Sequence, residues 1–249
     1  MVKVAGPGPG LEGGRRRAMI GRLLGGLVVS SQAHRSGGPL DAPDVLVRMA
    51  LAAADGGAAG FRVASAEVVA RLRPVTDLPI IGLIKRHVPG YEVYITPSAG
   101  EVAALITAGA DIVAADAAAT SRPAEPFAEL AELCHQRDVA IMADCATTEQ
   151  ALVAAAQGAD IVATTLAGHT SQTRGVVLPD LRMLAELKSL VNVPVAAEGG
   201  VWGPDHVAAA FAAGADFIVV GSAVTDPERI TRRLLRAIPT REGLREEKV

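Results

Sequence analysis

Three stretches of the chain repeat one pattern: "AGADIVAADA" at residues 108–117, "QGADIVATTL" at 157–166 and "AGADFIVVGS" at 213–222. In each copy a glycine follows a helical pattern, and glycine suits the left-handed conformation that ends many helices. An aspartate comes next, directly before an apolar run typical of a buried strand. "GGAAGFRV" at 56–63 is a degraded fourth copy. The pattern predicts a repeated unit of helix, turn and strand.

Apolar runs and amphipathic stretches alternate along most of the chain. We predict eight strands, within residues 25–32, 59–65, 78–86, 110–117, 139–146, 159–168, 193–201 and 215–224. We predict helices between and after them, at 42–55, 66–73, 98–108, 126–136, 147–156, 179–190, 204–213 and 226–237. Strands this apolar have no face suited to solvent, which indicates parallel strands that are covered on both sides and joined by right-handed crossovers.

The repeat also distinguishes between two parallel architectures. Its glycines near positions 57, 109, 158 and 214 are about two units apart, which fits a closed barrel of eight units. An open doubly wound sheet is the alternative, but it usually shows a G-x-G-x-x-G turn after its first strand. Here "SSQAHRSGG" stands in that place. We therefore predict an α/β fold, a (β/α)8 TIM barrel.

Composition excludes several classes of partner. Half of the 249 residues are hydrophobic but only 3% are aromatic, so the core must consist mainly of Ala, Val, Leu and Ile. The net charge of -3 provides no basic field to recruit nucleic acid. No apolar run is long and uninterrupted enough to cross a membrane. We expect neither nucleic acid nor a membrane as a partner.

Cysteine usage and the N-terminus favour the cytoplasm. Cys134 and Cys145 form no disulfide framework, and neither a C-x-x-C motif nor a zinc spacing occurs, so no metal is expected. Residues 13–33 outline a secretory signal, but Arg22 interrupts the apolar part and no clean cleavage site follows.

Three segments make up the expected organisation. Residues 1–20 form a flexible leader rich in Gly, Pro and Arg. Residues 21–239 form a single barrel domain. Residues 240–249 form a charged C-terminal tail.

Polar residues stand at the C-terminal ends of the predicted strands, where the working residues of such barrels lie. They are Gln32, Arg62, Lys85, Asp116, Asp144, Thr164, Thr165, Glu198, Gly221 and Ser222. Charges late in apolar strands are costly to bury unless they are paired or used.

A lysine in a half-dry barrel mouth becomes available as a base near neutral pH, and this is the role we predict for Lys85. Glu198 could move a proton at the same carbon. The pair predicts proton transfer next to a carbonyl. The alternative is a structural ion pair, Lys85–Glu198 or Arg62–Asp144, that only closes the top of the barrel.

Glycines after the last two predicted strands indicate a phosphate site. "EGGV" at 198–201 and "VGSAV" at 220–224 lie in the loops that usually cradle phosphate in these barrels, together with the start of a short helix. His34 and His87 flank the mouth and could touch a substrate, although loop histidines are more often simply solvated.

At these residues the chain resembles a known family. Segments in order from about Leu24 to Ile238, the most distinctive being "IGLIKR" at 81–86 and "TTLAGHT" at 164–170, are similar to the N-acetylmannosamine-6-phosphate 2-epimerase family. The resemblance implies a barrel like those that bind ribulose phosphate. It also implies an isomerase that interconverts N-acetylmannosamine 6-phosphate and N-acetylglucosamine 6-phosphate in bacterial sialic acid catabolism, with no metal or nucleotide cofactor.

The resemblance also implies a role for each matching residue. Lys85 would be the base at C2 and Glu198 its acid/base partner. Three residues would contact or orient the sugar, and three would hold the 6-phosphate of this small-molecule partner. The first set is Gln32, Arg62 and Asp144, and the second is Gly199, Gly221 and Ser222. A homodimer is expected.

The chain departs from the family pattern at four positions. Ser31 and Ala118 stand where the family commonly has cysteine and threonine, and Gly200 and Asp226 stand where it commonly has basic residues. Each lost positive charge could cost about 1–3 kcal/mol if it contacted an anionic sugar. These changes leave the exact amino sugar phosphate open. An aldolase or lyase that uses Lys85 as a Schiff-base amine and a non-catalytic sugar-phosphate-binding barrel are the alternatives.

Overall fold

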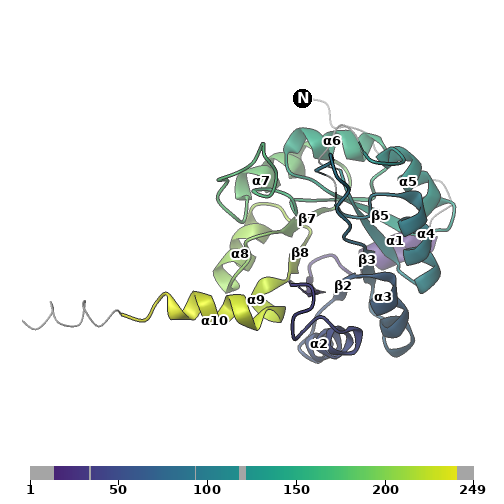
Figure 1. Ribbon diagram of the computed structural model, residues 1–249. Coiled ribbons are helices and arrows are strands. Elements are labelled where there is room, and N and C mark those ends of the chain that lie inside the picture. The colour runs from purple at the N-terminus through teal and green to yellow at the C-terminus, as the bar shows by residue number, and fades with distance from the viewer. Residues whose placement is uncertain (1–13, 34, 93, 118–121, 240–249) are drawn as a thin grey trace, which may run out of the picture.

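The strands close into one barrel in the computed structural model, which describes residues 14–33, 35–92, 94–117 and 122–239. Eight strands pair in chain order, every pair is parallel, and β8 pairs with β1 (Figure 1). They are β1 (Leu27–Ser31), β2 (Gly60–Ala64), β3 (Ile80–Leu83), β4 (Ile112–Asp116), β5 (Ala140–Asp144), β6 (Ile161–Ala163), β7 (Val195–Glu198) and β8 (Phe217–Val220). The predicted (β/α)8 barrel is confirmed.

Helices follow the strands and cover the outside of the barrel (Figure 1). They are α2 (Pro43–Asp55), α3 (Ala66–Leu72) with the 3-10 turn η1 (Arg73–Val75), α4 (Ala99–Ala108), α5 (Phe127–His135), α6 (Thr148–Ala156), α7 (Leu181–Leu190) and α8 (Pro204–Ala212). Past β8 come the short α9 (Ser222–Thr225) and α10 (Pro227–Leu235), while α1 (Gly14–Gly21) precedes the barrel.

Two apolar layers hold the barrel together. Side chains on a strand alternate between faces, so one set packs against the helices and the other fills the barrel. On β3, for example, Ile80 belongs to the outer layer, whereas Ile81 and Leu83 belong to the inner one. This alternation determines which residues at the strand ends can reach the barrel mouth.

The repeated aspartates act at the opposite, N-terminal end. Each lies before an even-numbered strand and accepts an N–H from the first or second residue of the preceding strand. The pairs are Asp111 with Ile80 at 3.0 Å, Asp160 with Ile141 at 2.9 Å and Asp216 with Val195 at 2.9 Å. The glycines of the repeat are left-handed, at φ +99°, +99° and +105° for Gly109, Gly158 and Gly214. The repeat is therefore a structural device.

Helix α1 packs at this same end. Arg15 bonds Asp111 at 2.8 Å, Arg16 lies 3.5 Å from Asp160, and Ile20 is buried in the inner layer. Residues 14–20 therefore belong to the fold, and the barrel domain begins before residue 21. Residues 1–13 and the expected tail at 240–249 lie outside the described residues.

No helix within the described ranges combines the length and the apolarity needed to cross a bilayer.

Candidate active site

Strand alternation brings three charged side chains to the inside of the barrel mouth. Arg62 lies between Phe61 and Val63, which face the outer layer, so its own side chain faces inward. Asp144 and Glu198 end β5 and β7 on the inward side in the same way. The predicted convergence of these residues is present.

Arg62 lies between the two carboxylates. Its Nη1 and Nη2 donate to Oδ1 and Oδ2 of Asp144 at 3.0 and 2.8 Å, a two-pronged pairing. Nη1 also donates to Oε2 of Glu198. The Thr165 hydroxyl lies 2.6 Å from Asp144 Oδ1 and 3.1 Å from Glu198 Oε2, so it bridges the two acids. Four side chains from four strands or strand ends thus form one network.

This network is dry on its inner side. The side chains of Arg62 and Asp144 are 2% and 0% exposed, and a charge buried that deeply needs a hydrogen-bonded partner. Burial opposes the charge of Arg62, but Asp144 and Glu198 together raise its pKa above the ordinary value. The structure therefore contains the Arg62–Asp144 ion pair that was considered as a purely structural alternative. This pair keeps the charged guanidinium of Arg62 next to Glu198.

The carboxyl group of Glu198 has a perturbed pKa. Burial raises its pKa to about 7, and the charge of Asp144 acts in the same direction, while Arg62 and Thr165 partly oppose the shift. The side chain keeps a 15% exposed fraction toward the mouth. A carboxyl group with this pKa can hold or release a proton at neutral pH, which is the property of a general acid or base.

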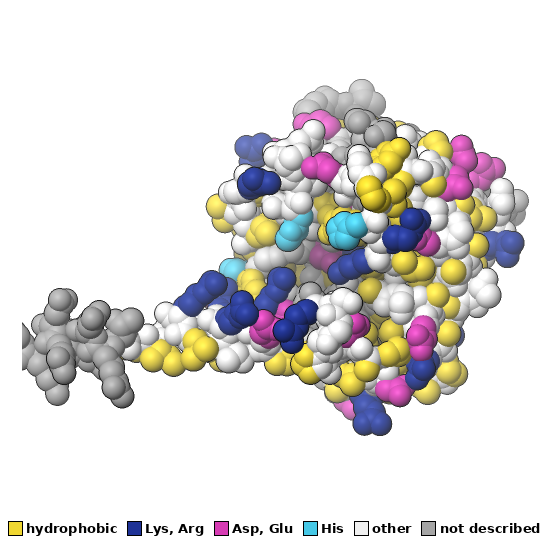
Figure 2. All heavy atoms as spheres, viewed as in Figure 1, with side chains coloured by type: hydrophobic (Ala, Val, Ile, Leu, Met, Phe, Trp, Pro, Cys, Tyr) yellow, Lys and Arg dark blue, Asp and Glu magenta, His cyan; other side chains and the backbone are white. Residues whose placement is uncertain are grey.

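Lys85 completes the group from the loop after β3. It is exposed, yet partial burial lowers its pKa, and the charge of Arg62 lowers it further. The charges of Glu198 and Asp144 act in the opposite direction, so the amine lies within electrostatic range of the whole network. Over the described ranges no ion pair joins Lys85 to Glu198. Figure 2 shows basic and histidine side chains around a recessed acidic one near the centre of this face.

Other predicted residues lie around the network. Gln32 is buried, and its Nε2 donates to Ser30 at 2.8 Å. The Thr164 hydroxyl accepts the Glu198 N–H at 3.1 Å and donates to the Glu198 carbonyl at 2.9 Å, which anchors the end of β7. Asp116 ends β4 on the inward side and is buried.

The predicted glycines form the turns after the last two strands. Gly199 and Gly200 adopt φ +103° and +72°, conformations that glycine allows and other residues rarely adopt. Gly221 directly precedes Ser222, where α9 begins. The short helix predicted after the last strand is present.

The structure explains three of the four departures from the family pattern. A Cβ at Gly200 would lie 2.3 Å from the Cβ of Leu178, so the loop before α7 leaves no room for a side chain. Asp226 caps α10 by accepting the Arg229 N–H at 3.0 Å. Ser31 points away from the mouth and donates to Leu46 on α2 at 2.8 Å, so this departure does not touch the site. Ala118 lies outside the described residues, as does His34.

Sequence reasoning found only His87 and Asp116 of one wall of the mouth. A pocket of about 210 Å³ is lined by His87, Tyr91, Glu92, Tyr94, Asp116, Leu166, His169 and Thr170. Tyr94 stacks on His87 with ring centroids 5.1 Å apart, and burial, with Asp144 and Asp116, raises the pKa of its phenol to about 12.

A local signal could have revealed this wall. The segment after β3 folds back, with Lys85 and Ile95 bridged in antiparallel fashion and the Arg86 N–H donating to Tyr94 at 2.8 Å. A Pro89–Gly90 turn followed by a run rich in aromatic and β-branched residues is a hairpin signal.

Comparisons with known proteins agree on one family. Residues 46–240 match a family model described as "Putative N-acetylmannosamine-6-phosphate epimerase". The chain is 40% identical over 225 residues to a "Putative N-acetylmannosamine-6-phosphate 2-epimerase" of Shouchella clausii, covering 89% of this chain and 99% of that one. A relative of the same name in Enterobacter sp. is 42% identical over 228 residues, covering 89% and 96%.

Solved structures give the same result. The N-acetylmannosamine-6-phosphate 2-epimerase of Clostridium perfringens has 37% identity and a TM-score of 0.85, covering 88% of this chain and 96% of that chain. A thiamine phosphate pyrophosphorylase of Pyrococcus furiosus, at 22% identity and a TM-score of 0.58 over 85% and 91%, shares the fold alone.

Proposed function

The chain belongs to the N-acetylmannosamine-6-phosphate epimerase family, and from that premise we propose that it interconverts N-acetylmannosamine 6-phosphate and N-acetylglucosamine 6-phosphate. The enzyme is an isomerase that inverts the configuration at C2. One observation carries the mechanism: an acid whose pKa is raised to about 7 and an amine whose pKa is lowered share one barrel mouth.

The proton transfer uses both groups. In the open-chain sugar, C2 lies next to the C1 carbonyl, so the C2–H bond can break and leave an enolate with its charge on the C1 oxygen. Neutral Lys85 takes that proton, and protonated Glu198 gives one to the opposite face of C2. In the reverse direction the charged lysine donates and the carboxylate accepts. The reaction conserves protons within the pair, and solvent exchanges with both groups.

The remaining residues bind and orient the substrate in this proposal. The guanidinium of Arg62, fixed by the two-pronged bond to Asp144, stabilises negative charge that develops on the sugar oxygen. Asp144 orients the sugar indirectly, by holding Arg62 in place, and Gln32 contacts a sugar hydroxyl group. Glycine backbone after β7 and β8 approaches the 6-phosphate, through Gly199, Gly221 and Ser222.

Proton NMR tests this function directly. N-acetylmannosamine 6-phosphate mixed with the full chain in deuterated water should yield N-acetylglucosamine 6-phosphate that carries deuterium at C2. No conversion would reject the activity. Conversion with the C2 hydrogen retained would reject the proton-transfer mechanism.

Lys85 could also act as a Schiff-base amine, because a lowered pKa favours that chemistry as well. Borohydride reduces an imine to a stable amine, so mass spectrometry separates the two mechanisms. The epimerase should show no covalent adduct after treatment with substrate and borohydride. An adduct on Lys85 would support the aldolase or lyase instead.

We propose that the working unit is a homodimer in which the second copy of the chain covers helix α10. This helix extends away from the barrel in Figure 1, and three apolar side chains at its end, Leu234, Leu235 and Ile238, are 57–66% exposed. An apolar face of this kind suits a second copy of the chain. Leu234→Glu with Leu235→Glu should convert a dimer to a monomer in light scattering. Val153→Glu, at an exposed apolar site on α6, is the control and should leave the mass unchanged.

We place the enzyme in the cytoplasm. Cys134 and Cys145 are both buried and free, as expected in a reducing compartment. Cell fractionation followed by immunoblotting tests this placement.

A further inference from the structure

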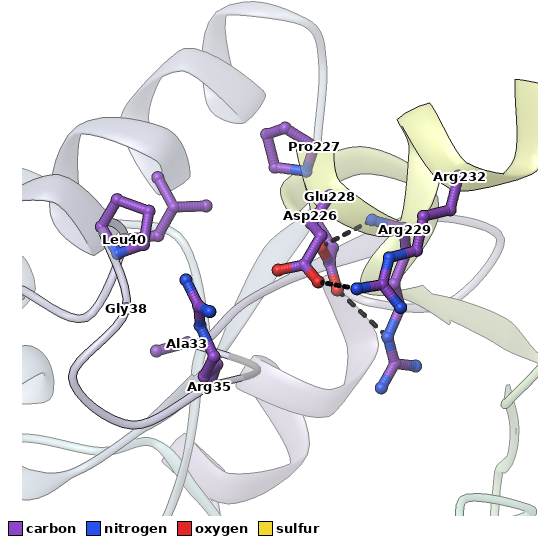
Figure 3. A pocket seen from close by; sticks show the side chains of 10 residues that line it. Ala33, Arg35, Gly38, Leu40, Asp226, Pro227, Glu228, Arg229 and Arg232 are labelled. Atoms are coloured by element: carbon purple, nitrogen blue, oxygen red, sulfur yellow. Dashed lines mark hydrogen bonds and ion pairs between the residues drawn. The ribbon is translucent and has the colours of Figure 1, made fainter. Parts of the chain in front are cut away.

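Two groups of charged side chains lie at the C-terminal end of the barrel, and they differ in burial. The first lines a pocket of about 340 Å³ between the loop after β1 and the start of α10 (Figure 3). Its acids pair with Arg229 and Arg232, whose side chains are 57% and 69% exposed, so water screens these pairs. The second group is the buried network around Glu198, where one hydrogen bond has a larger effect.

The strand order places Thr165 between the two acids of this network. Asp144 ends β5, Glu198 ends β7, and Thr165 follows the intervening β6. The residue after Thr165 donates its N–H to the carbonyl beyond β5 at 3.0 Å, and the residue before it donates to a carbonyl of β7 at 3.2 Å. The backbone therefore holds the hydroxyl between the carboxyl groups, 2.6 Å from Asp144 Oδ1 and 3.1 Å from Glu198 Oε2.

The preceding hydroxyl holds the backbone of the same acid. Thr164 accepts the Glu198 N–H at 3.1 Å and donates to the Glu198 carbonyl at 2.9 Å. Two consecutive threonines therefore act on Glu198, one on its backbone and one on its carboxyl group. Neither hydroxyl takes part in the proton transfer proposed for Lys85 and Glu198.

The contacts of Glu198 distinguish its two oxygens. Oε2 lies within hydrogen-bond distance of both Arg62 Nη1 and the Thr165 hydroxyl, whereas no hydrogen bond among the described residues reaches Oε1. A carboxylate oxygen has two lone pairs, so two donors saturate Oε2. Oε1 is therefore the oxygen of Glu198 that is available to a proton.

The single hydroxyl proton of Thr165 is shared between two acids. A threonine hydroxyl donates one hydrogen bond at a time, and the bond is stronger when the acceptor is ionised. Asp144 already accepts two N–H donors of Arg62, whereas Glu198 accepts one. The hydroxyl therefore donates to Asp144 while Glu198 is protonated and turns to Glu198 when that group is ionised.

We propose that Thr165 is a positioning residue for Glu198, because its hydroxyl and Arg62 together occupy Oε2 and leave Oε1 to carry the proton to and from C2. The inference rests on the proposed function for the reaction at C2. The pairing of Thr165 with Glu198 can nevertheless be measured without turnover.

A titration of Glu198 tests this pairing. With carbon-13 in the glutamate carboxyl groups, the NMR signal that is missing from Glu198→Gln belongs to Glu198, whose pKa is raised to about 7. Thr165→Val removes a donor to the ionised form and should raise the midpoint by about one pH unit. Thr165→Ser keeps the hydroxyl and should restore the wild-type midpoint. Neither substitution removes an ionisable group that faces this carboxyl group, namely Arg62 from β2, Lys85 and Tyr94 from the segment after β3, and Asp144 from β5.

Turnover gives the second readout. Thr165→Val should lower kcat by about 10- to 100-fold and change KM by less than about two-fold, because a misplaced carboxyl group affects the proton transfer and not the binding of the sugar. Thr165→Ser should recover most of the rate. Thr148→Val is the matched control, because it removes a hydroxyl that bonds Glu186 at 2.7 Å between α6 and α7. It should change neither kcat nor the midpoint of Glu198.

A double variant shows whether Thr165 acts through Glu198. In Glu198→Gln the remaining exchange of the C2 hydrogen depends on Lys85, so adding Thr165→Val should leave its rate unchanged. A further fall of about ten-fold there would mean that Thr165 acts on another group, and it would overturn the proposal.

An unchanged midpoint in Thr165→Val, or a serine variant that behaves like the valine variant, would overturn the proposal as well. Absence of epimerisation by the wild-type chain would instead reject the proposed function. The titration would then still decide whether Thr165 pairs with Glu198.

Discussion

The two ends of this barrel use the same kinds of charged residue for different purposes. At the N-terminal end Asp111, Asp160 and Asp216 each accept a strand N–H and meet a basic side chain. At the C-terminal end Asp144 and Glu198 bond one buried guanidinium, that of Arg62. The aspartates at the N-terminal end satisfy backbone N–H groups of the strands. The two acids at the C-terminal end are buried together with the cation that they share.

The difference teaches what perturbs a charge in this fold. An aspartate that joins strands can draw its partners from the surface, such as Lys188 with Asp216 at 2.6 Å. Glu198 hydrogen-bonds to Arg62 and Thr165 beside the charge of Asp144, and burial dominates its pKa. The C-terminal end therefore has an acid whose pKa is raised to about 7 and an amine whose pKa is lowered, and the N-terminal end has groups that hold the barrel together.

The largest effect is expected at Lys85. Lys85→Ala removes the base, and general acid–base groups contribute about 10²–10⁴-fold to rate, so kcat should fall by that factor. The side chain is exposed, so thermal unfolding should be unchanged. An alanine variant that keeps the wild-type rate would remove Lys85 from the mechanism.

Glu198 gives the next largest effect, on the pH dependence of stability. Its pKa is about 7 when folded and about 4.5 when unfolded, so between these values the folded state holds the extra proton and the free energy of unfolding falls as pH rises. The loss should reach up to about 3 kcal/mol by pH 8. Urea unfolding at pH 5 and pH 8 measures it. Glu198→Gln should lack this component, and an equal loss in both proteins would contradict the shift.

A medium effect is expected at the N-terminal end. Asp160→Ala leaves the Ile141 N–H unpaired, and such a group costs about 1–3 kcal/mol of unfolding free energy. Urea denaturation should show this loss, while kcat of the folded protein stays within two-fold. A large fall in kcat with unchanged stability would erase the contrast between the two ends.

The smallest effect is expected at Ser31, which precedes the predicted site residue Gln32 in the chain but points toward α2. Ser31→Ala removes the hydrogen bond to Leu46 and should cost about 1 kcal/mol in unfolding free energy. KM and kcat should match the wild type. A ten-fold rise in KM would mean that this side chain does reach the substrate.

Sequence periodicity was sufficient for the barrel and for much of the mouth. The positions of Arg62, Asp144 and Glu198 late in apolar runs predict that they lie near the barrel mouth, and these three do meet. The sequence pattern did not determine which of these charged side chains form ion pairs with each other. A structural Lys85–Glu198 or Arg62–Asp144 pair was the alternative interpretation. The Arg62–Asp144 pair is present, and Arg62 also contacts Glu198, because side-chain length and barrel stagger select the partners.

Loops limited the prediction elsewhere. Gly200 could be recognised as a missing charge, but only the packing of Leu178 shows that no side chain fits there. Arg35 and Arg229 are separated by almost the whole chain, and only barrel closure between β1 and β8 brings them into one pocket. Contacts of this kind depend on tertiary placement that no local pattern encodes.

Exchange of the C2 hydrogen in the two single variants tests the two-group mechanism most directly. Each epimer, incubated in deuterated water with Lys85→Ala or Glu198→Gln, is followed by proton NMR. If the two groups serve opposite faces of C2, each variant should exchange hydrogen in one epimer only, a different one for each variant, without epimerisation. Exchange of the same epimer by both variants, or epimerisation at the wild-type rate by either, would contradict the account.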